Sequence, residues 1–380
     1  MKKLFSLLFA ALLAVYAAPV SASPLPVDLG GAAAAMLVCA ETGDVILESH
    51  ADEPIEAAGL RRLPALLAVC RAFDEGRIAD ETEVTVSPGA AGVRGATAFL
   101  APNEKIKAGL LLKAAVMLTA GDAVCALLEA IYPSEAAALE GVNAELTRVG
   151  ASPMEGSPLG EGHAFTLREL SAVCLELAGS ESCLRYSSVY LDSLPHENAS
   201  ATELTNPNRL VRHYSGCFGI ATGSVGASDY AAAAIATRGS TTYLALVCGM
   251  DDSASRFEVT RALLDHGFSA YRAGVLYKKG ETAASIPVRG GTAGEVSLSP
   301  ERDAAVLVPT GDPKTVSEFD LPGSVEAPVS AGDVLGRLII KDASGTVIAE
   351  APLVAQNDIA SAGFGLWFIR LIRGWLRADG

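Results

Sequence analysis

Lysine is nearly missing from most of this chain of 380 residues. No lysine lies between Lys3 and Lys105, and none lies between Lys113 and Lys278. No serine has a lysine three residues later, and no lysine is followed by Ser-Gly or Thr-Gly. On a helix, a lysine three residues after a serine would lie one turn away on the same face, where its amine could reach the hydroxyl. The sequence therefore excludes a serine–lysine nucleophilic pair with that spacing.

Paired cysteines are also missing, because none of the seven cysteines belongs to a C-x-x-C motif. Several lie in apolar runs, such as residues 66–70 and 244–248. Metal and redox sites need clustered ligands, and Asp251, Asp252 and Asp265 are too few and too local to form one. We therefore expect buried, small hydrophobic cysteines and neither a metal nor a cofactor. The odd number of cysteines leaves a disulfide open.

Positive charge is scarce overall, with 29 Lys and Arg against 44 Asp and Glu and a net charge of −15. Such an acidic chain is a poor partner for nucleic acid, whose phosphates bind Lys and Arg. Half of the residues are hydrophobic, which is enough for a sizeable core. The length suggests one large domain and a smaller one.

The first 22 residues have the pattern of a secretory signal peptide. Lys2 and Lys3 precede an apolar run at residues 4–18, and residues 20–22 are small enough for cleavage. The run is short for a membrane span. We expect an exported protein.

Residues 30–268 alternate between strand and helix patterns and form one predicted domain. Two β-hairpins are expected, one with strands at 34–39 and 44–48 and one with strands at 230–237 and 241–249. Apolar spacing predicts helices at 63–73, 110–118, 123–132, 167–177 and 256–266, the last one ending at Gly267. Hairpins at both ends with helices between them predict an α+β fold with an antiparallel sheet.

Residues 270–358 have a different pattern of apolar residues, with strand-like runs at 288–296, 304–308 and 334–340. Turns rich in Gly and Pro separate these runs. The pattern predicts a small, β-sandwich-like all-β domain.

The last segment, residues 362–380, contains both tryptophans of the chain, Trp367 and Trp375. The segment is predicted to be a helix with Phe364, Phe368, Leu371 and Trp375 on one side. On another side of this helix lie Arg370, Arg373 and Arg377. Arginines beside aromatic residues are typical of an amphipathic helix that lies in a membrane surface. The alternative is a helix docked on the body of the protein itself.

Three short segments occupy the order and spacing of a known set of motifs. Residues 59–62 read Gly-Leu-Arg-Arg, residues 119–121 read Thr-Ala-Gly, and residues 221–223 read Ala-Thr-Gly. They resemble degenerate forms of S-x-x-K, S-x-N and K-[ST]-G, the motifs of penicillin-binding proteins and serine β-lactamases. The segments at 94–102 and 206–210 also match this group of proteins. So does the order of signal peptide, two domains and tail. Taken together, these features make the chain resemble the D-alanyl-D-alanine carboxypeptidases. These are the low-molecular-mass penicillin-binding proteins of bacterial cell walls.

The resemblance implies where the reactive groups would lie, and most are absent. Gly59 stands in place of the nucleophilic serine and cannot be acylated, and Arg62 replaces the lysine but stays protonated. Thr119 keeps a hydroxyl in place of the serine of the second motif, and Gly121 lacks the amide of its asparagine. Ala221 lacks the positive charge of the lysine of the third motif. The family's acyl-enzyme chemistry therefore lacks several groups at once, and rate losses at such sites are large.

Three residues are predicted to bind substrate because the resemblance assigns them there. Thr222 and Gly223 retain the end of the third motif, on a strand edge that would hold a peptide. Arg256 resembles a family arginine that approaches the substrate's terminal carboxylate, a contact that suits a guanidinium fork. The alternative for Arg256 is a surface ion pair at the start of a helix.

Other nucleophiles are weaker candidates. A new Ser–His arrangement would draw on Ser215 or Ser224 with His163 or His213, but the chain has no G-x-S-x-G motif. Cys217 lies in an apolar stretch without an adjacent cation.

These observations predict an exported, catalytically impaired homologue of serine-type carboxypeptidases, held peripherally at the outer face of a bacterial cytoplasmic membrane. Its expected partner is a peptidoglycan stem peptide or a cell-wall protein. The alternatives are an active carboxypeptidase with non-standard residues and a structural adaptor at the membrane surface.

Overall fold

The computed structural model describes residues 26–197, 199–226, 228–311 and 314–363. The predicted signal peptide and all but the first two residues of the predicted membrane-surface helix lie outside the described residues. No helix in the described ranges is long and apolar enough to cross a membrane. All seven cysteines are described and carry free thiols, and all except Cys125 are buried, as expected.

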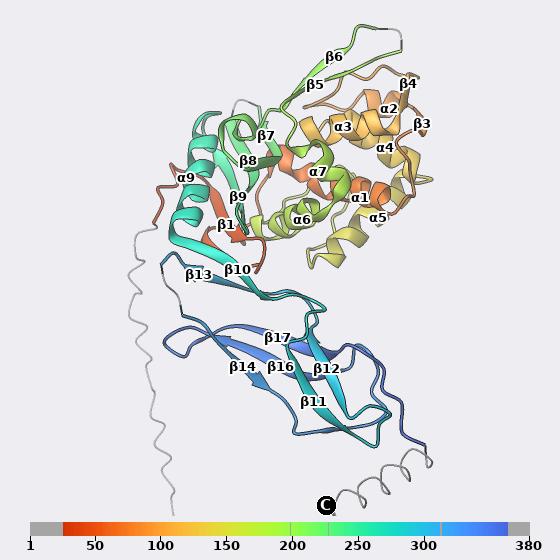
Figure 1. Ribbon diagram of the computed structural model, residues 1–380. Helices are drawn as coiled ribbons and strands as arrows, with labels where there is room; N and C mark the ends of the chain where they lie inside the picture. Colours follow the sequence, from red (N-terminus) through yellow and green to blue (C-terminus); the bar gives the residue numbers. More distant parts are fainter. Residues whose placement is uncertain (1–25, 198, 227, 312–313, 364–380) are drawn as a thin grey trace, which may run out of the picture.

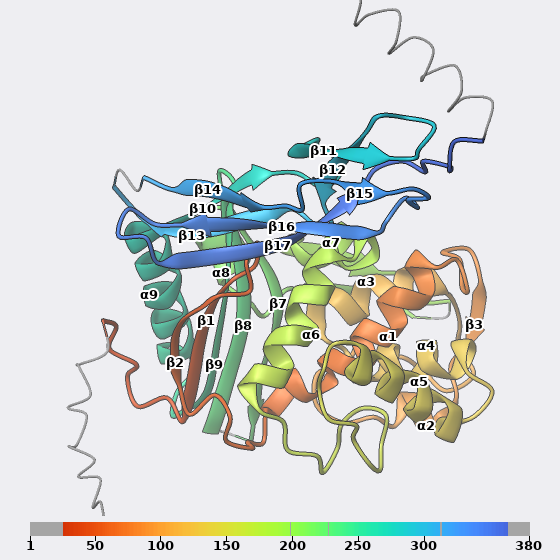
Figure 2. The same ribbon diagram turned by 90° about the horizontal axis from the view of Figure 1, so that it is seen from below.

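A five-stranded antiparallel sheet in the order β2-β1-β9-β8-β7 organises the larger domain. Both predicted hairpins are confirmed, and β1 pairs with β9, which joins the two ends of the domain. β7 is an edge strand, and it lies on the side of the sheet nearest to α1 and α3 (Figure 2). The bounds are β1 (Ala34–Cys39), β2 (Val45–Ser49), β7 (Cys217–Val225), β8 (Ser228–Arg238) and β9 (Thr241–Met250).

Most helices cover one face of this sheet, and α9 covers the other (Figures 1 and 2). The bounds are η1 (Ala58–Arg62), α1 (Leu63–Asp74), α2 (Pro88–Ala91), α3 (Ala108–Leu118), α4 (Gly121–Ile131), α5 (Glu135–Arg148), α6 (Leu167–Gly179), α7 (Glu181–Ser187), α8 (Leu210–His213) and α9 (Ser255–Ala270). Two short hairpin-like pairs complete the domain: β3 (Glu83–Thr85) with β4 (Lys105–Lys107), and β5 (Leu191–Leu194) with β6 (Thr202–Thr205).

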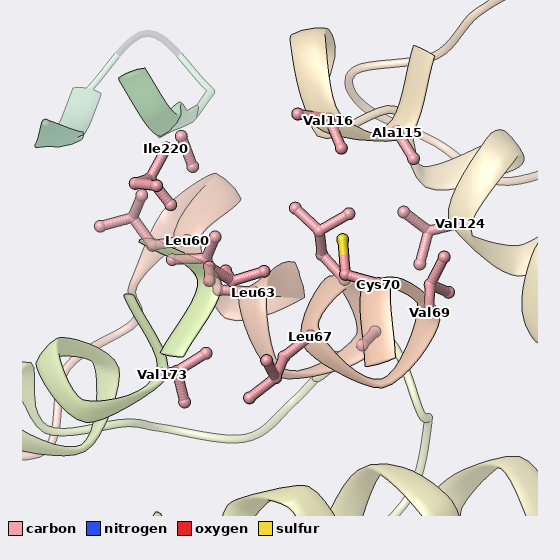
Figure 3. Close-up of a cluster of buried hydrophobic side chains, with 14 of the residues drawn as sticks. Leu60, Leu63, Leu67, Val69, Cys70, Ala115, Val116, Val124, Val173 and Ile220 are labelled. Atoms are coloured by element: carbon pink, nitrogen blue, oxygen red, sulfur yellow. The ribbon is translucent and has the colours of Figure 1, made fainter. Parts of the chain in front are cut away.

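Residues 63–70 of helix α1 are all buried, because this part of the helix runs through the centre of the helical layer. Figure 3 shows Leu63, Leu67 and Cys70 of α1 among side chains from the surrounding helices and from η1. Ile220 of β7 belongs to the same buried cluster. Burial of these side chains drives the packing that fixes η1 against the sheet.

Helix α9 continues three residues beyond the predicted stop at Gly267 and ends at Ala270. The prediction was wrong because glycine serves here for close packing. A Cβ atom at position 267 would lie 3.0 Å from a ring carbon of Tyr243, a buried residue of β9. The glycine thus lets α9 approach the sheet closely.

The smaller domain is all β, as predicted. A six-stranded sheet has the order β14-β16-β17-β12-β11-β15, and β10 pairs with β13 in a separate ribbon. The bounds are β10 (Tyr271–Tyr277), β11 (Ala284–Arg289), β12 (Glu295–Pro300), β13 (Ala304–Pro309), β14 (Val316–Asp320), β15 (Val325–Glu326), β16 (Val334–Lys341) and β17 (Val347–Ala355). The strand-like run expected at 288–296 instead spans the end of β11, a turn and the start of β12, and Gly290 in the turn takes a positive φ of 67°. The two domains together confirm the predicted α+β class.

Candidate functional site

The three degenerate motifs converge on one pocket of about 450 Å³. Six of the residues predicted as site residues line it, and they come from η1, the end of α3, β7 and α9: Gly59, Arg62, Thr119, Thr222, Gly223 and Arg256. Gly121 lies behind Arg62, and Ala221 faces the buried core next to β8. The motifs found in the sequence therefore meet at this pocket, and Gly121 and Ala221 lie in the wall behind it.

At the position of the missing nucleophile, the main chains of η1 and β7 touch. A Cβ atom on Gly59 would lie 2.6 Å from the carbonyl oxygen of Thr222 and 3.0 Å from Cα of Gly223. A Cβ atom on Gly223 would in turn collide with the backbone nitrogen of Gly59. Real Cβ atoms do not approach backbone this closely, so the contact requires glycine on both sides. The space of a nucleophilic side chain is filled by backbone.

Arg62 occupies the position of the missing lysine and is almost fully buried, with 3% of its surface exposed. Its Nη1 donates hydrogen bonds of 3.1 Å to the carbonyl oxygens of Ala96 and Thr119, and its Nη2 donates to the carbonyl of Arg94. Burial, with a smaller contribution from Arg61, lowers the pKa of Arg62. Its Nε has no partner in the described part of the chain. In the described part of the chain, carbonyl oxygens bond to this cation, and the charges of Glu161 and Asp122 also favour it.

Gly121 makes room for that guanidinium. A Cβ atom at position 121 would lie 2.6 Å from Cζ of Arg62 and 2.6 Å from Cγ1 of Val93. The Gly121 N–H donates to the carbonyl of Ala96 at 2.8 Å, which brings α4 against the same loop. An asparagine at position 121 would overlap with Arg62, so these two departures from the family motifs depend on each other.

Thr119 ends α3 in a left-handed conformation with φ 51° and ψ 40°. It is buried, and its carbonyl oxygen accepts one of the hydrogen bonds from Arg62. Left-handed backbone is rare for a β-branched residue and costs energy. The arginine therefore helps to hold a strained turn at the edge of the pocket.

Arg256 reaches from the first turn of α9 to the backbone of the sheet. Its Nη1 donates to the carbonyl of Gly223 at 2.7 Å and to that of Ala231 at 3.4 Å. The guanidinium lies over the rings of Tyr230 and Phe257, 5.1 and 4.6 Å from their centroids. Only 8% of its surface is exposed, and burial lowers its pKa. The alternative of a surface ion pair is wrong, because the residue is buried and bonded to carbonyl groups.

The pocket carries positive charge in a strongly acidic protein. Arg61, Arg62 and Arg256 line it, and among the residues that the structure describes no Asp or Glu does. Coulomb attraction in such a partly enclosed site favours an anion. The side chains can therefore hold a carboxylate, although none of them can supply a nucleophile at the usual position.

The other candidate nucleophiles do not form a catalytic pair. Ser224 lines the pocket, but its hydroxyl donates to the carbonyl of Gly226, and none of the described histidines lines the pocket. Neither Ser215 nor Ser224 hydrogen-bonds to a histidine within the described ranges. Burial raises the pKa of Cys217 to about 12, which leaves almost no thiolate at neutral pH.

One residue that shapes the site was missed by the sequence analysis. The carboxylate of Asp122, buried in the first turn of α4, accepts hydrogen bonds from the N–H groups of Ala98, Leu100 and Ala123. These bonds fix the loop whose carbonyls bind Arg62. A carboxylate in the first turn of an apolar helix was its only signal.

Comparisons with known proteins match both domains. A family model described as D-alanyl-D-alanine carboxypeptidase matches residues 21–252, and one described as penicillin-binding protein 5, C-terminal domain, matches residues 271–361. D-alanyl-D-alanine carboxypeptidase DacF of Bacillus subtilis (strain 168) is 28% identical over 352 residues, covering 91% of this chain and 90% of DacF. DacC of Escherichia coli (strain K12), with the same description, is 24% identical over 345 residues, covering 85% of this chain and 83% of DacC.

A solved structure shows the same architecture. Penicillin-binding protein 5 of Haemophilus influenzae superposes with a TM-score of 0.77 at 20% identity, covering 87% of this chain and 98% of that one. The likeness extends over both domains and agrees with the α+β fold described above. With the family match over the larger domain, it assigns the chain to a known group. The protein belongs to the D-alanyl-D-alanine carboxypeptidase family of cell-wall proteins.

Proposed function

We propose that this protein is a catalytically impaired member of its family that binds peptidoglycan stem peptides without cleaving them. The observation that carries the proposal is the contact between Gly59 and the backbone of Thr222 and Gly223. Acyl transfer requires a nucleophile at this place and a base that can accept its proton. Backbone fills the first position, and a permanently charged, buried arginine fills the second.

Binding capacity is supported by what remains of the cleft. β7 is an edge strand of the five-stranded sheet, and its residues Thr222, Gly223 and Ser224 line the pocket, so an extended peptide in the pocket would lie along this strand. Arg61, Arg62 and Arg256 surround the adjoining pocket and suit a carboxylate at the end of that peptide. Several relatives are named D-alanyl-D-alanine carboxypeptidases, and a peptide that ends in D-Ala-D-Ala carries such a carboxylate.

Calorimetry combined with product analysis tests the proposal. A synthetic peptide that ends in D-Ala-D-Ala is titrated into the mature protein, and the mixture is then assayed for free D-alanine. We expect heat of binding and no release of D-alanine above the blank. Release at a rate typical of enzymes would show an active carboxypeptidase, and absence of binding would favour a structural adaptor. A peptide ending in L-Ala-L-Ala serves as the control for stereospecificity.

We also propose that the protein is exported and held at the outer face of the cytoplasmic membrane. The proposal rests on the sequence patterns of residues 1–22 and 362–380. Liposome flotation of the mature chain, compared with a variant that ends at Ser361, tests the tether. We expect only the longer chain to float with anionic vesicles, and equal flotation of both would exclude the tail as the anchor.

A further inference from the structure

A second pocket, of about 350 Å³, lies between the loop before β4 and the end of the β5–β6 hairpin. The hairpin projects from the larger domain beside β4 (Figure 1). Among the described residues, none lines both this hairpin pocket and the cleft that contains Arg62 and Arg256. The hairpin pocket is therefore a separate site.

Three side chains of the hairpin pocket form a continuous line of hydrogen bonds. Nε2 of His196 lies 2.8 Å from Oγ1 of Thr202, and Nδ1 of His196 lies 2.7 Å from Oε1 of Glu104. All three residues line the pocket. The side chains of His196 and Glu104 are each only 5% exposed, so water has little access to the bond between them. A nucleophilic hydroxyl, an imidazole base and an orienting carboxylate follow each other in this order in hydrolytic triads.

The carboxylate of Glu104 determines which nitrogen of His196 carries the proton. A carboxylate accepts hydrogen bonds, so Nδ1 of the imidazole donates to Oε1. Nε2 of a neutral ring then carries the lone pair and accepts from the hydroxyl of Thr202. The hydroxyl is thereby directed at a base, as its attack on a carbonyl carbon requires.

The loop that carries Glu104 is firmly held and has a strained backbone. Oε2 of Glu104 accepts a hydrogen bond of 3.0 Å from the N–H of Ala101, and the carbonyl of Glu104 accepts one of 2.9 Å from the N–H of Val86. Phe99 and Asn103, which also line the pocket, have positive φ angles of 59° and 65°. Such backbone is uncommon outside glycine and clusters at functional sites. The loop thus fixes the carboxylate that orients the imidazole.

The remaining lining indicates a small, uncharged substrate. Phe99 is 76% exposed and offers an apolar ring to a ligand. Glu197 adds a second carboxylate, and no Lys or Arg in the described ranges lines the pocket, so an anion is disfavoured. Asn103 carries a side-chain amide, a donor of the kind that stabilises the oxyanion of acyl transfer. These groups suit a neutral ester with a short acyl chain.

We propose that the hairpin pocket hydrolyses small, uncharged carboxylic esters, with Thr202 and His196 as catalytic residues and Glu104 as a positioning residue. Oγ1 of Thr202 attacks the carbonyl carbon while Nε2 of His196 takes its proton. The ester C–O bond then breaks, and the alcohol leaves with that proton. A water molecule, deprotonated by the same nitrogen, releases the carboxylic acid and restores the hydroxyl. This activity goes beyond the peptide binding proposed for the cleft and does not depend on it.

Hydrolysis of p-nitrophenyl acetate by the protein tests the proposal. We expect T202A to lower kcat/KM about a hundred-fold, the scale of positioned acid–base catalysis. T202S should keep or raise the rate, because a primary hydroxyl is less hindered. The matched control T205A changes an exposed threonine of the same strand and should keep the rate. No hydrolysis above the blank, or equal rates of T202A and the unsubstituted protein, would overturn the proposal.

A neutral alkyl fluorophosphonate supplies a readout that does not depend on turnover. An activated hydroxyl displaces its fluoride and forms a P–O bond to the reagent. Peptide mapping by mass spectrometry should place the adduct on Thr202, and T202A should stay unlabelled at this peptide. An adduct only at other residues, or no adduct, would refute the role of Thr202 as the nucleophile.

Variants of the other two residues separate catalysis from a purely structural role. H196A should lose the activity, and added imidazole should restore part of it by acting as the base in the vacated space. E104Q should lower kcat and leave KM nearly unchanged, because Glu104 acts through His196. Full activity of H196A would exclude His196 as the base. A raised KM with unchanged kcat in E104Q would contradict the positioning role.

Discussion

The guanidinium of Arg62 occupies the space over Gly121, where a Cβ atom would lie 2.6 Å from its Cζ. Position 62 normally carries the lysine of the first family motif, and position 121 the asparagine of the second. One larger side chain and one absent side chain compensate for each other in volume. The structure therefore shows a wall of the cleft that has been repacked and still encloses a pocket.

We predict a measurable coupling between these two positions. G121N should destabilise the protein by about 1–3 kcal/mol, because the new side chain overlaps with Arg62. The shorter lysine of R62K should relieve part of that overlap, so R62K/G121N should be more stable than the sum of the single effects implies. Urea unfolding of the four proteins measures the coupling free energy, expected at about 0.5–3 kcal/mol. Additive effects would show that the two side chains do not compete for space.

A serine placed at the position of the missing nucleophile should destabilise the protein. A serine at position 59 would collide with the carbonyl of Thr222, and G59S should cost about 1–3 kcal/mol of unfolding free energy. Gly179 at the end of α6 has open space where its Cβ would lie, so G179S should stay within about 0.5 kcal/mol. Thermal unfolding of both variants checks the difference. A G59S protein of native stability would contradict the backbone contact.

Arg256 should contribute to stability through the carbonyl groups it binds. R256A removes buried hydrogen bonds to Gly223 and Ala231 and should cost about 2–3 kcal/mol. R256K keeps the charge but lacks the planar fork, and we expect a smaller loss. The exposed Arg289 provides a control, since R289A should change stability by less than about 0.5 kcal/mol. Equal stabilities of R256A and R289A, measured by urea unfolding, would refute the structural role.

The pH dependence of Cys125 alkylation should report its raised pKa. Burial, followed by the charges of Glu129, Glu135 and Glu161, raises the pKa of this thiol to about 12. Only on the order of one thiol in a thousand is then ionised near pH 9, where ordinary thiols are largely ionised. The iodoacetamide rate should therefore keep rising through pH 10. E129Q/E161Q removes negative charge that opposes the thiolate, so its rate at fixed pH should be higher. A plateau near pH 9 in the unsubstituted protein would contradict the burial and charge described for this thiol.

Most of the fold was predictable because its patterns are local. The hairpin β1–β2 follows from two short apolar runs around a turn, and helix α1 follows from apolar spacing. Gly267 misled the prediction, since glycine signals both a helix end and a close contact with a neighbour such as Tyr243. Sequence spacing cannot separate these two uses, because only the packed structure shows which atoms lie near the glycine.

The residues that line the site could be predicted from the sequence, but most of the contacts between them could not. Resemblance to family motifs brought Gly59, Arg62 and Thr222 to one pocket, and the structure confirms that they line it. The dependence between Arg62 and Gly121 could not be derived, because it arises from contacts between residues 59 positions apart. The buried role of Arg256 was missed for the same reason: its partners are backbone carbonyls of β7 and β8, which carry no sequence signal.

Incubation with a fluorescent penicillin, followed by intact-protein mass spectrometry, tests the central claim most directly. A β-lactam ring acylates any nucleophile that the family mechanism could use, so the reaction needs no knowledge of the natural ligand. We predict no covalent adduct on any residue of the cleft. A stoichiometric adduct on a residue of the cleft would contradict the proposal that this protein binds without catalysis.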